Sequence, residues 1–211
     1  KLVNQYTYPA QNSDFSAGRF PDGTSTWENF GIPTPGEANT FKTVTLISTV
    51  KINEIMAKNV KTIKDASGVY EDWIEFYNTG ATSVNLGGIF ITDSIDDIYK
   101  WRISNKYPDS VTIAPGGYLT FWADNDPKQG VRHLGFKLNE AGEGIYLFQI
   151  SGKNTNMIEF SEFQSQYADI TYGKYPNGTG TMQFLKPTYN ASNQQLAKLS
   201  VNCTISTDIQ S

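Results

Sequence analysis

The sequence YEDWIEFYN, residues 70–78, alternates along its length in the way that a β-strand requires. Successive side chains of a strand point to opposite faces, so Ile74 and Phe76 share one face while Trp73 and Tyr77 share the other. Six further segments show strand-forming patterns, at residues 50–57, 88–93, 98–103, 117–124, 144–150 and 156–163. Short clusters of turn-forming residues separate these segments. The spacing predicts an all-β fold, an immunoglobulin-like antiparallel β-sandwich.

The composition agrees with a globular, strand-rich chain. Of the 211 residues, 38% are hydrophobic, 18% are charged and 13% are aromatic, and aromatic residues favour strands. Residues 193–199 are the one segment that suggests a short helical turn. The net charge of −4 provides no broad cationic surface, which argues against a nucleic-acid partner. No apolar run reaches the length of a membrane span, so we expect no membrane insertion.

The single cysteine, Cys203, excludes an internal disulfide and a cysteine-rich zinc site. The absence of disulfides is compatible with secretion, because many bacterial surface proteins contain none. The sequence begins at Lys1 without a signal-peptide pattern. We therefore interpret it as a mature or trimmed chain from which a targeting segment has been removed.

A second signal is an internal repeat. The sequence GRFPDGT at residues 18–24 returns as GKYPNGT at residues 173–179, an offset of 155 that also relates Gln11 to Gln166 and Asp14 to Asp169. After a slip of one residue, four further residues align with their counterparts: Phe30 with Phe184, Pro33 with Pro187, Thr34 with Thr188 and Asn39 with Asn193. Repetition over this length indicates tandem domains.

The repeat predicts four regions. Residues 1–40 are the C-terminal remnant of a preceding repeat, 41–49 a linker, 50–193 a complete β-sandwich domain, and 194–211 a C-terminal extension or linker. Strands of an incomplete domain leave backbone donors and acceptors unpaired. We therefore expect residues 1–40 to lie as added strands against the complete domain or a neighbouring molecule.

The complete domain resembles the lamin tail domain family in its bacterial form. The motifs that carry the resemblance, in order, are INEIMAKN, DWIEFYNTGATSVNLGGIFITD, KWRI, TIAPGGYLTFWADND, GFKLNEAGEGIYLF, ITYGKYPNGTG and KPTYNASN. The resemblance implies an immunoglobulin-like sandwich that serves as a non-catalytic module of secreted and surface proteins, often beside hydrolase or nuclease domains. The filament and chromatin roles of animal lamins are not implied, because the sequence has no heptad rod and no basic nuclear-localisation cluster.

Catalytic candidates are few. His133 is the single histidine, and no nucleophile elbow or activated cysteine accompanies it, so a structural role is favoured. Glu54, Asp72 and Glu75 lie on neighbouring predicted strands and could approach each other as the paired carboxylates of a glycosidase. Acids on the exposed face of a sheet are the simpler interpretation. We therefore expect no catalytic residue and no enzyme activity.

Two loops carry clusters of oxygen ligands that calcium could use. These are Asp93, Asp96 and Asp97 in one loop, and Asp124, Asn125 and Asp126 in the other. Neither has EF-hand spacing, and Asp and Asn also favour turns by bonding local backbone groups. The sequence leaves calcium binding at these loops open, and we assign no metal site, cofactor site or cofactor.

Aromatic residues provide an alternative function, because flat rings can stack on sugars. Trp73 and Trp122 lie in predicted strands, where burial is expected, and Trp27 and Trp101 are the better candidates for exposure. We expect a non-catalytic structural or adhesion module of a larger secreted or cell-surface bacterial protein, which docks a protein partner or spaces neighbouring domains. The alternative is a carbohydrate-binding accessory module of an extracellular hydrolase, with a surface polysaccharide as its partner.

Overall fold

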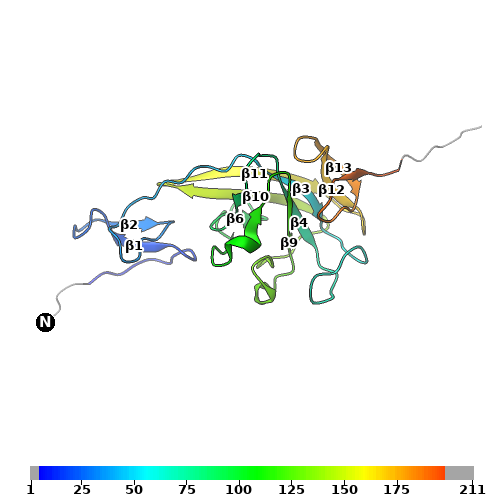
Figure 1. Cartoon of the computed structure of the whole chain (residues 1–211). Helices are drawn as coiled ribbons and strands as arrows, with labels where there is room; N and C mark the ends of the chain where they lie inside the picture. Colours follow the sequence, from blue (N-terminus) through cyan, green and yellow to red (C-terminus); the bar gives the residue numbers. More distant parts are fainter. Residues whose placement is uncertain (1–4, 198–211) are drawn as a thin grey trace, which may run out of the picture.

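The computed structural model describes residues 5–197 (Figure 1), so Cys203 lies outside the described residues. The described chain is all-β, with two short 3₁₀ helices, η1 (Pro108–Val111) and η2 (Pro127–Gln129). Its strands are β1 (Ser16–Arg19), β2 (Trp27–Phe30), β3 (Val50–Met56), β4 (Trp73–Asn78), β5 (Val84–Asn85), β6 (Phe90–Thr92), β7 (Trp101–Arg102), β8 (Thr112–Ile113), β9 (Tyr118–Trp122), β10 (Gly142–Ser151), β11 (Asn154–Gln164), β12 (Thr171–Tyr175), β13 (Thr181–Lys186) and β14 (Gln194–Gln195).

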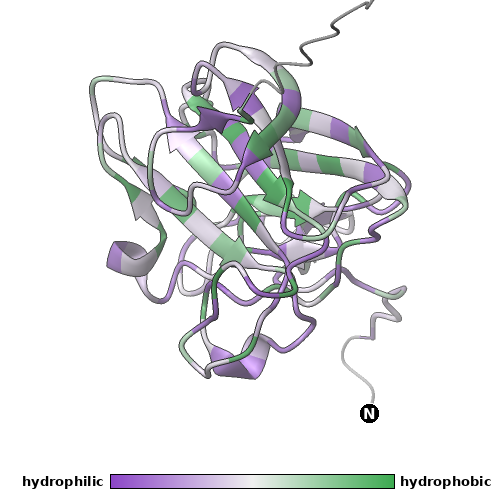
Figure 2. Ribbon diagram, turned by 90° about the vertical axis from the view of Figure 1, so that its right-hand side faces the viewer, coloured by the Kyte–Doolittle hydropathy of each residue, from purple (hydrophilic) through white to green (hydrophobic). Residues whose placement is uncertain are grey.

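Two antiparallel sheets form the sandwich. One has the strand order β14-β13-β12-β3-β4-β9 and the other the order β11-β10-β6-β7. The hydrophobic core lies between them, where Ile52, Phe76 and Phe121 of the first sheet meet Ile91 and Leu147 of the second. In Figure 2 the strands carry bands of hydrophobic residues that alternate with hydrophilic ones. This confirms the predicted antiparallel, immunoglobulin-like β-sandwich.

Strand β4 is buried on both faces. Ile74 and Phe76 belong to the main core, as the alternation predicts. On the opposite face, Trp73 packs with Met56 and Trp122 in a second cluster. The residues that follow β13 cover this second face, and Tyr189 meets the Trp73 ring edge-on at 6.1 Å. Glu75 is therefore buried as well, in contrast to the exposed face expected from the sequence.

The first two strands form a separate hairpin. β1 and β2 pair only with each other, in a two-stranded sheet, so they are not added strands of the complete domain as expected. The hairpin contacts the domain through side chains instead: Phe15 and Ile32 pack against the cluster of Phe90, Phe148 and Ile150. Among the described residues β1 therefore adds to no sheet of the domain, because its one strand partner is β2 and apolar side chains make the contact. Pairing of these strands with a neighbouring molecule stays a prediction.

The linker at residues 41–49 runs beside the end of β10. The Ile47 N–H donates to Gln149 Oε1 at 2.8 Å, and the Gly152 N–H donates to the Lys42 carbonyl at 2.8 Å. The Val44 N–H and carbonyl both bond the Ser151 hydroxyl, at 3.0 Å each. Figure 1 shows the β1–β2 hairpin beyond the tip of the long β10–β11 pair. The linker is thus bonded to the domain along its length.

The C-terminal strands revise two details of the sequence analysis. Opposite residues pair as Ser16 with Phe30 in the hairpin, and as Thr171 with Leu185 in the domain. Phe30 is therefore the structural counterpart of Leu185, because the one-residue slip falls after β2. The predicted helical turn is also wrong within its described part: β14 pairs with β13 there.

Candidate functional site

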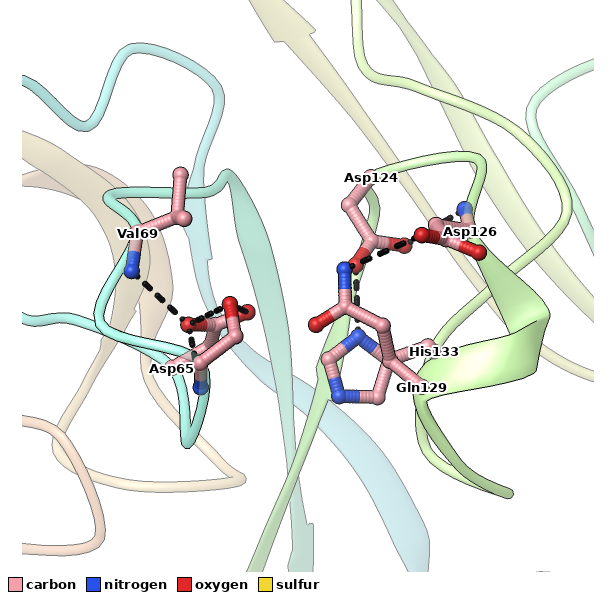
Figure 3. A network of polar contacts seen from close by, with 7 residues as sticks. Asp65, Val69, Asp124, Asp126, Gln129 and His133 are labelled. Carbon is pink, nitrogen blue, oxygen red and sulfur yellow. Dashed lines mark hydrogen bonds and ion pairs between the residues drawn. The ribbon is translucent and has the colours of Figure 1, made fainter.

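One cluster of acidic and histidine side chains stands out among residues 5–197. Asp65, Asp124 and His133 each offer a ligand atom, and these atoms lie within 4.8 Å of one another (Figure 3). Asp65 lies in the loop between β3 and β4, Asp124 follows β9, and His133 comes after η2. Loops far apart in the sequence thus meet at one point, so we considered this cluster first as a metal centre.

Asp124 and His133 form a tight pair. His133 Nδ1 and Asp124 Oδ2 are 2.5 Å apart, and the two residues are only 7% and 5% exposed. The Asp126 N–H donates to Asp124 Oδ1 at 3.0 Å, and the histidine ring stacks on Trp122. Two atoms that ligate one zinc ion tetrahedrally lie about 3.3 Å apart. The contact is therefore a hydrogen bond, and these two atoms do not chelate one ion between them.

Asp65 is held by its own turn. Its carboxylate accepts hydrogen bonds from the Val69 N–H at 2.9 Å and from the N–H and hydroxyl of Ser67 at 2.9 and 2.8 Å. Burial acts to raise the pKa of Asp65, but these bonds and the nearby His133 outweigh it and hold the pKa below its usual value. The oxygens of Asp65 are thus already bonded within its own turn, which faces the hydrogen-bonded pair of Asp124 and His133.

We expect the His133→Ala variant to be less stable than the parent chain by about 2 kcal/mol, because it leaves the carboxyl group of buried Asp124 without its hydrogen bond to the histidine ring. Removal of metal ions with EDTA should leave the melting temperature of the parent chain unchanged. Differential scanning calorimetry measures both effects. Gln129→Ala is the matched control, since Gln129 is exposed and bonds only Asp126, at 3.3 Å. A lower melting temperature in EDTA would instead identify a bound metal.

A hollow of about 540 Å³ lies beside the Asp65–Asp124–His133 cluster. Its walls include Trp122, His133 and Tyr189, together with Ser110 from η1. Among the described residues, no hydroxyl or thiol is hydrogen-bonded to the His133 ring, so the Ser–His–Asp arrangement of a hydrolase is not assembled.

Two of the predicted acids, Glu54 and Glu75, do lie close together, but they are buried away from solvent. Glu54 and Glu75 face each other across β3 and β4, and both are fully buried. Burial, followed by the neighbouring Glu54, raises the pKa of Glu75 to about 8. Burial also raises the pKa of Asp72, to about 6, and its carboxylate accepts the Asn59 N–H at 3.0 Å. The interpretation of these acids as exposed surface groups is corrected: Glu54 and Glu75 lie inside the domain.

The carboxyl group of Glu54 is part of a polar network that the sequence analysis missed. It accepts hydrogen bonds from the Thr188 N–H and hydroxyl at 3.1 and 2.9 Å, and from the Thr171 hydroxyl at 2.5 Å. Asn193 completes the network, because its side-chain amide donates to the carbonyls of Asn53 and Lys174 at 3.0 and 2.7 Å. The repetition of Thr188 and Asn193 as Thr34 and Asn39 was the signal that could have identified them.

The two loops considered for calcium do not gather their side chains into sites of their own. Asp93 pairs with Lys100 at 2.6 Å, while Asp96 and Asp97 are exposed. Asp124 turns inward to His133, whereas Asn125 is exposed with a left-handed backbone. The one cluster of the described chain with ligand spacing takes Asp65 from the β3–β4 loop, and Asp124 and His133 from the β9–β10 connection, on either side of η2.

The tryptophans are placed as parts of the packing. Trp73 and Trp122 are buried, as expected. Trp27 and Trp101 are half-buried. One face of Trp27 is covered by Tyr6, with ring centroids 3.6 Å apart and planes nearly parallel. These four residues do not form a shared exposed platform for sugar rings.

A comparison with protein families finds one match: the model described as Lamin Tail Domain covers residues 43–162. The match runs from the linker through most of β11 and includes Asp65, Asp124 and His133. Searches among curated proteins and among solved structures gave no match.

Proposed function

The chain belongs to the lamin tail domain family, and we propose that it is a docking and spacing module of a larger bacterial secreted or cell-surface protein. The family is one of immunoglobulin-like, non-enzymatic domains, which supports a role without catalysis. The burial of Glu54 and Glu75 also supports this role, because a substrate has no access to this carboxylate pair.

The docking of the β1–β2 hairpin is the observation that carries the proposal. Its residues Phe15 and Ile32 pack on the domain, Glu28 pairs with Lys153 at 3.1 Å, and the Arg102 guanidinium donates to the Asp14 carbonyl at 3.1 Å. The linker adds its own bonds to β10. A repeat element fixed in this way against the next domain sets the distance and orientation between successive units, which is what a spacer requires.

Fluorescence energy transfer tests the fixed geometry. One dye is placed at exposed Ser25 and the other at exposed Lys128, in a chain whose Cys203 is replaced by Ser. We expect a single narrow distance distribution. Phe15→Ala, which removes an aromatic ring from the contact, should broaden it, while Leu46→Ala on the exposed linker should not. A broad distribution in the parent chain would contradict the spacer role.

Protein docking is favoured over sugar binding because the tryptophans contribute to packing instead of forming a stacking surface. A glycan array is the direct comparison, and specific binding of a polysaccharide would overturn this preference. Within the described residues no helix is long and apolar enough to cross a membrane. Fractionation of cells that express the full-length protein tests the proposed extracellular or surface location.

A further inference from the structure

In the complete domain, Thr188 and Asn193 form a hydrogen-bond network with the β12–β13 hairpin, which we call the polar lock. The β1–β2 hairpin contains the corresponding bonds. The Asn39 amide donates to the Arg19 carbonyl at 2.9 Å, and the Thr34 hydroxyl donates to Asn39 Oδ1 at 3.3 Å. The counterpart bonds, from Asn193 to Lys174 and from Thr188 to Asn193, measure 2.7 and 3.0 Å. The two hairpins are therefore the same structural element.

The backbone of the two closing turns agrees as well. The Asn39 N–H donates to Asp22 Oδ1 at 3.1 Å, and the Asn193 N–H donates to Asn177 Oδ1 at 2.9 Å. Gly23 and Gly178 both have left-handed φ angles, 78° and 66°. The hairpin thus keeps the shape of the lock in addition to its residues.

In the complete domain this lock holds strand β3. The Gly178 N–H donates to Asn53 Oδ1 at 3.1 Å, and the Asn193 amide donates to the Asn53 carbonyl. Thr188 and Thr171 bind the Glu54 carboxyl group. The Asn–Glu pair of β3 is thus recognised by donors from β12, its closing turn and the segment after β13.

The β1–β2 hairpin lies at one end of the molecule (Figure 1). In it, the counterparts of these donor residues line a hollow of about 470 Å³. Its walls include Ser16, Gly18, Gly23, Thr34 and Asn39, the counterparts of the residues that hold β3. Among residues 5–197 no strand lies along the edge of β1 that faces away from β2. Thr34 is buried like Thr188, and its hydroxyl bonds Asn39 Oδ1, whereas the Thr188 hydroxyl bonds both Asn193 Oδ1 and the Glu54 carboxyl group.

The correspondence extends beyond the strand itself. In the domain, Gln166 Oε1 accepts the Ala57 N–H at 2.8 Å, and Asp169 Oδ1 accepts the Val60 and Lys61 N–H groups at 3.0 and 2.8 Å. Their counterparts, Gln11 and Asp14, are exposed. The hairpin region therefore retains the acceptors for the segment that follows β3.

We propose that the edge of β1 is a strand-acceptor site, which binds an extended segment with the Ile–Asn–Glu–Ile pattern of residues 52–55 from another copy of the repeat. The incoming strand pairs with β1 as β3 pairs with β12, with its Glu opposite Gly18 as Glu54 is opposite Gly173. The Glu carboxylate accepts hydrogen bonds from Thr34 and Ser16, and the Asn side chain accepts the Gly23 N–H. This inference rests on the proposed docking role and names its partner.

Fluorescence anisotropy with a labelled peptide, KINEIMAKN, the sequence of residues 51–59, tests the site. We expect saturable one-to-one binding to the full chain. A peptide in which Gln replaces the Glu should bind at least about tenfold more weakly, because it loses charge-assisted bonds while the protein is unchanged. Thr34→Val in the protein should weaken binding similarly, whereas Asn29→Ala on β2 should have no effect.

Photo-crosslinking locates the bound peptide. A crosslinker at the first position of the peptide, the counterpart of Lys51, should label residues within 16–39. Labelling of residues within 171–193 would show that the peptide replaces β3 in the complete domain and would overturn the proposal. Absence of saturable binding, or equal binding of the Gln peptide, would also overturn it. The spacer role would survive that result if the energy-transfer distances stay narrow, so the two failures are distinguishable.

Discussion

The Asn193→Ala variant should lose about 3 kcal/mol of unfolding free energy, whereas Asn39→Ala should lose about 1 kcal/mol or less. Asn193 makes four side-chain hydrogen bonds: its amide donates to the Asn53 and Lys174 carbonyls, and its carbonyl accepts from Asn53 and Thr188. These four hydrogen bonds are buried or partly buried. The variant would leave their partner groups on Asn53, Lys174 and Thr188 without these bonds and shielded from water, which costs free energy. Asn39 bonds Arg19 and Thr34 in the same way, but it has no counterpart of the two bonds that join Asn193 to Asn53 of β3, so its loss should cost less.

Urea unfolding followed by tryptophan fluorescence measures both variants. The buried Trp73 and Trp122 report on the complete domain, which contains Asn193 but not Asn39. Equal losses for the two variants would show that the contacts with β3 add nothing to the lock. That result would also remove the physical basis for the strand-acceptor site, because the site depends on the value of the same contacts.

Stability should fall as the pH rises from about 4.5 to about 8. The ordinary pKa of Glu75 is 4.5, and burial together with Glu54 raises it to about 8 in the folded chain. Between these values the unfolded chain releases a proton that the folded chain keeps, so each step upward in pH favours unfolding; above pH 8 the contribution is constant. The expected loss from Glu75 is on the order of 4 kcal/mol across this window.

Neighbouring acids add to the same trend. Burial raises the pKa of Glu54, and it raises that of Asp72 to about 6. Glu75→Gln, which cannot ionise, should flatten much of the slope between pH 5 and pH 8. Chemical denaturation at several pH values gives the measurement. Stability that increases over this range, or an unchanged slope in the variant, would contradict a neutral Glu75 in the folded chain.

The alternation of residues 70–78 was sufficient to predict β4 and its core residues Ile74 and Phe76, because a local pattern determines a strand's period. It could not predict that Glu75 is buried. That depends on which distant segment covers the second face of the sheet, and here it is the segment that includes Asn190, whose N–H donates to Glu75 at 2.6 Å. A half-exposed strand and a fully covered one have the same period, so the sequence pattern favoured the simpler case.

The closing signature is visible in the sequence as a repeat, but the repeat does not show that its first residues, from Gly173 to Tyr175, belong to strand β12. Position 173 in β12 requires a glycine, because the Asn53 carbonyl of β3 lies only 2.5 Å from where a Cβ would be. The glycine thus permits the two strands to approach closely. The proximity of Asp65, Asp124 and His133 could not be predicted for a different reason. Its members come from separate loops, and only the folded sandwich brings them together. Local turn chemistry around Asp65 was the one visible signal.

The bonded linker also has a mechanical consequence. Residues 42–47 run antiparallel to the end of β10, and their bonds to Gln149, Ser151 and Gly152 lie side by side along one line. Tension applied through the hairpin along this line loads these bonds together in shear, whereas tension across it would peel them apart one at a time. The contact between the linker and β10 would therefore resist a pull along the chain and yield to a pull from the side.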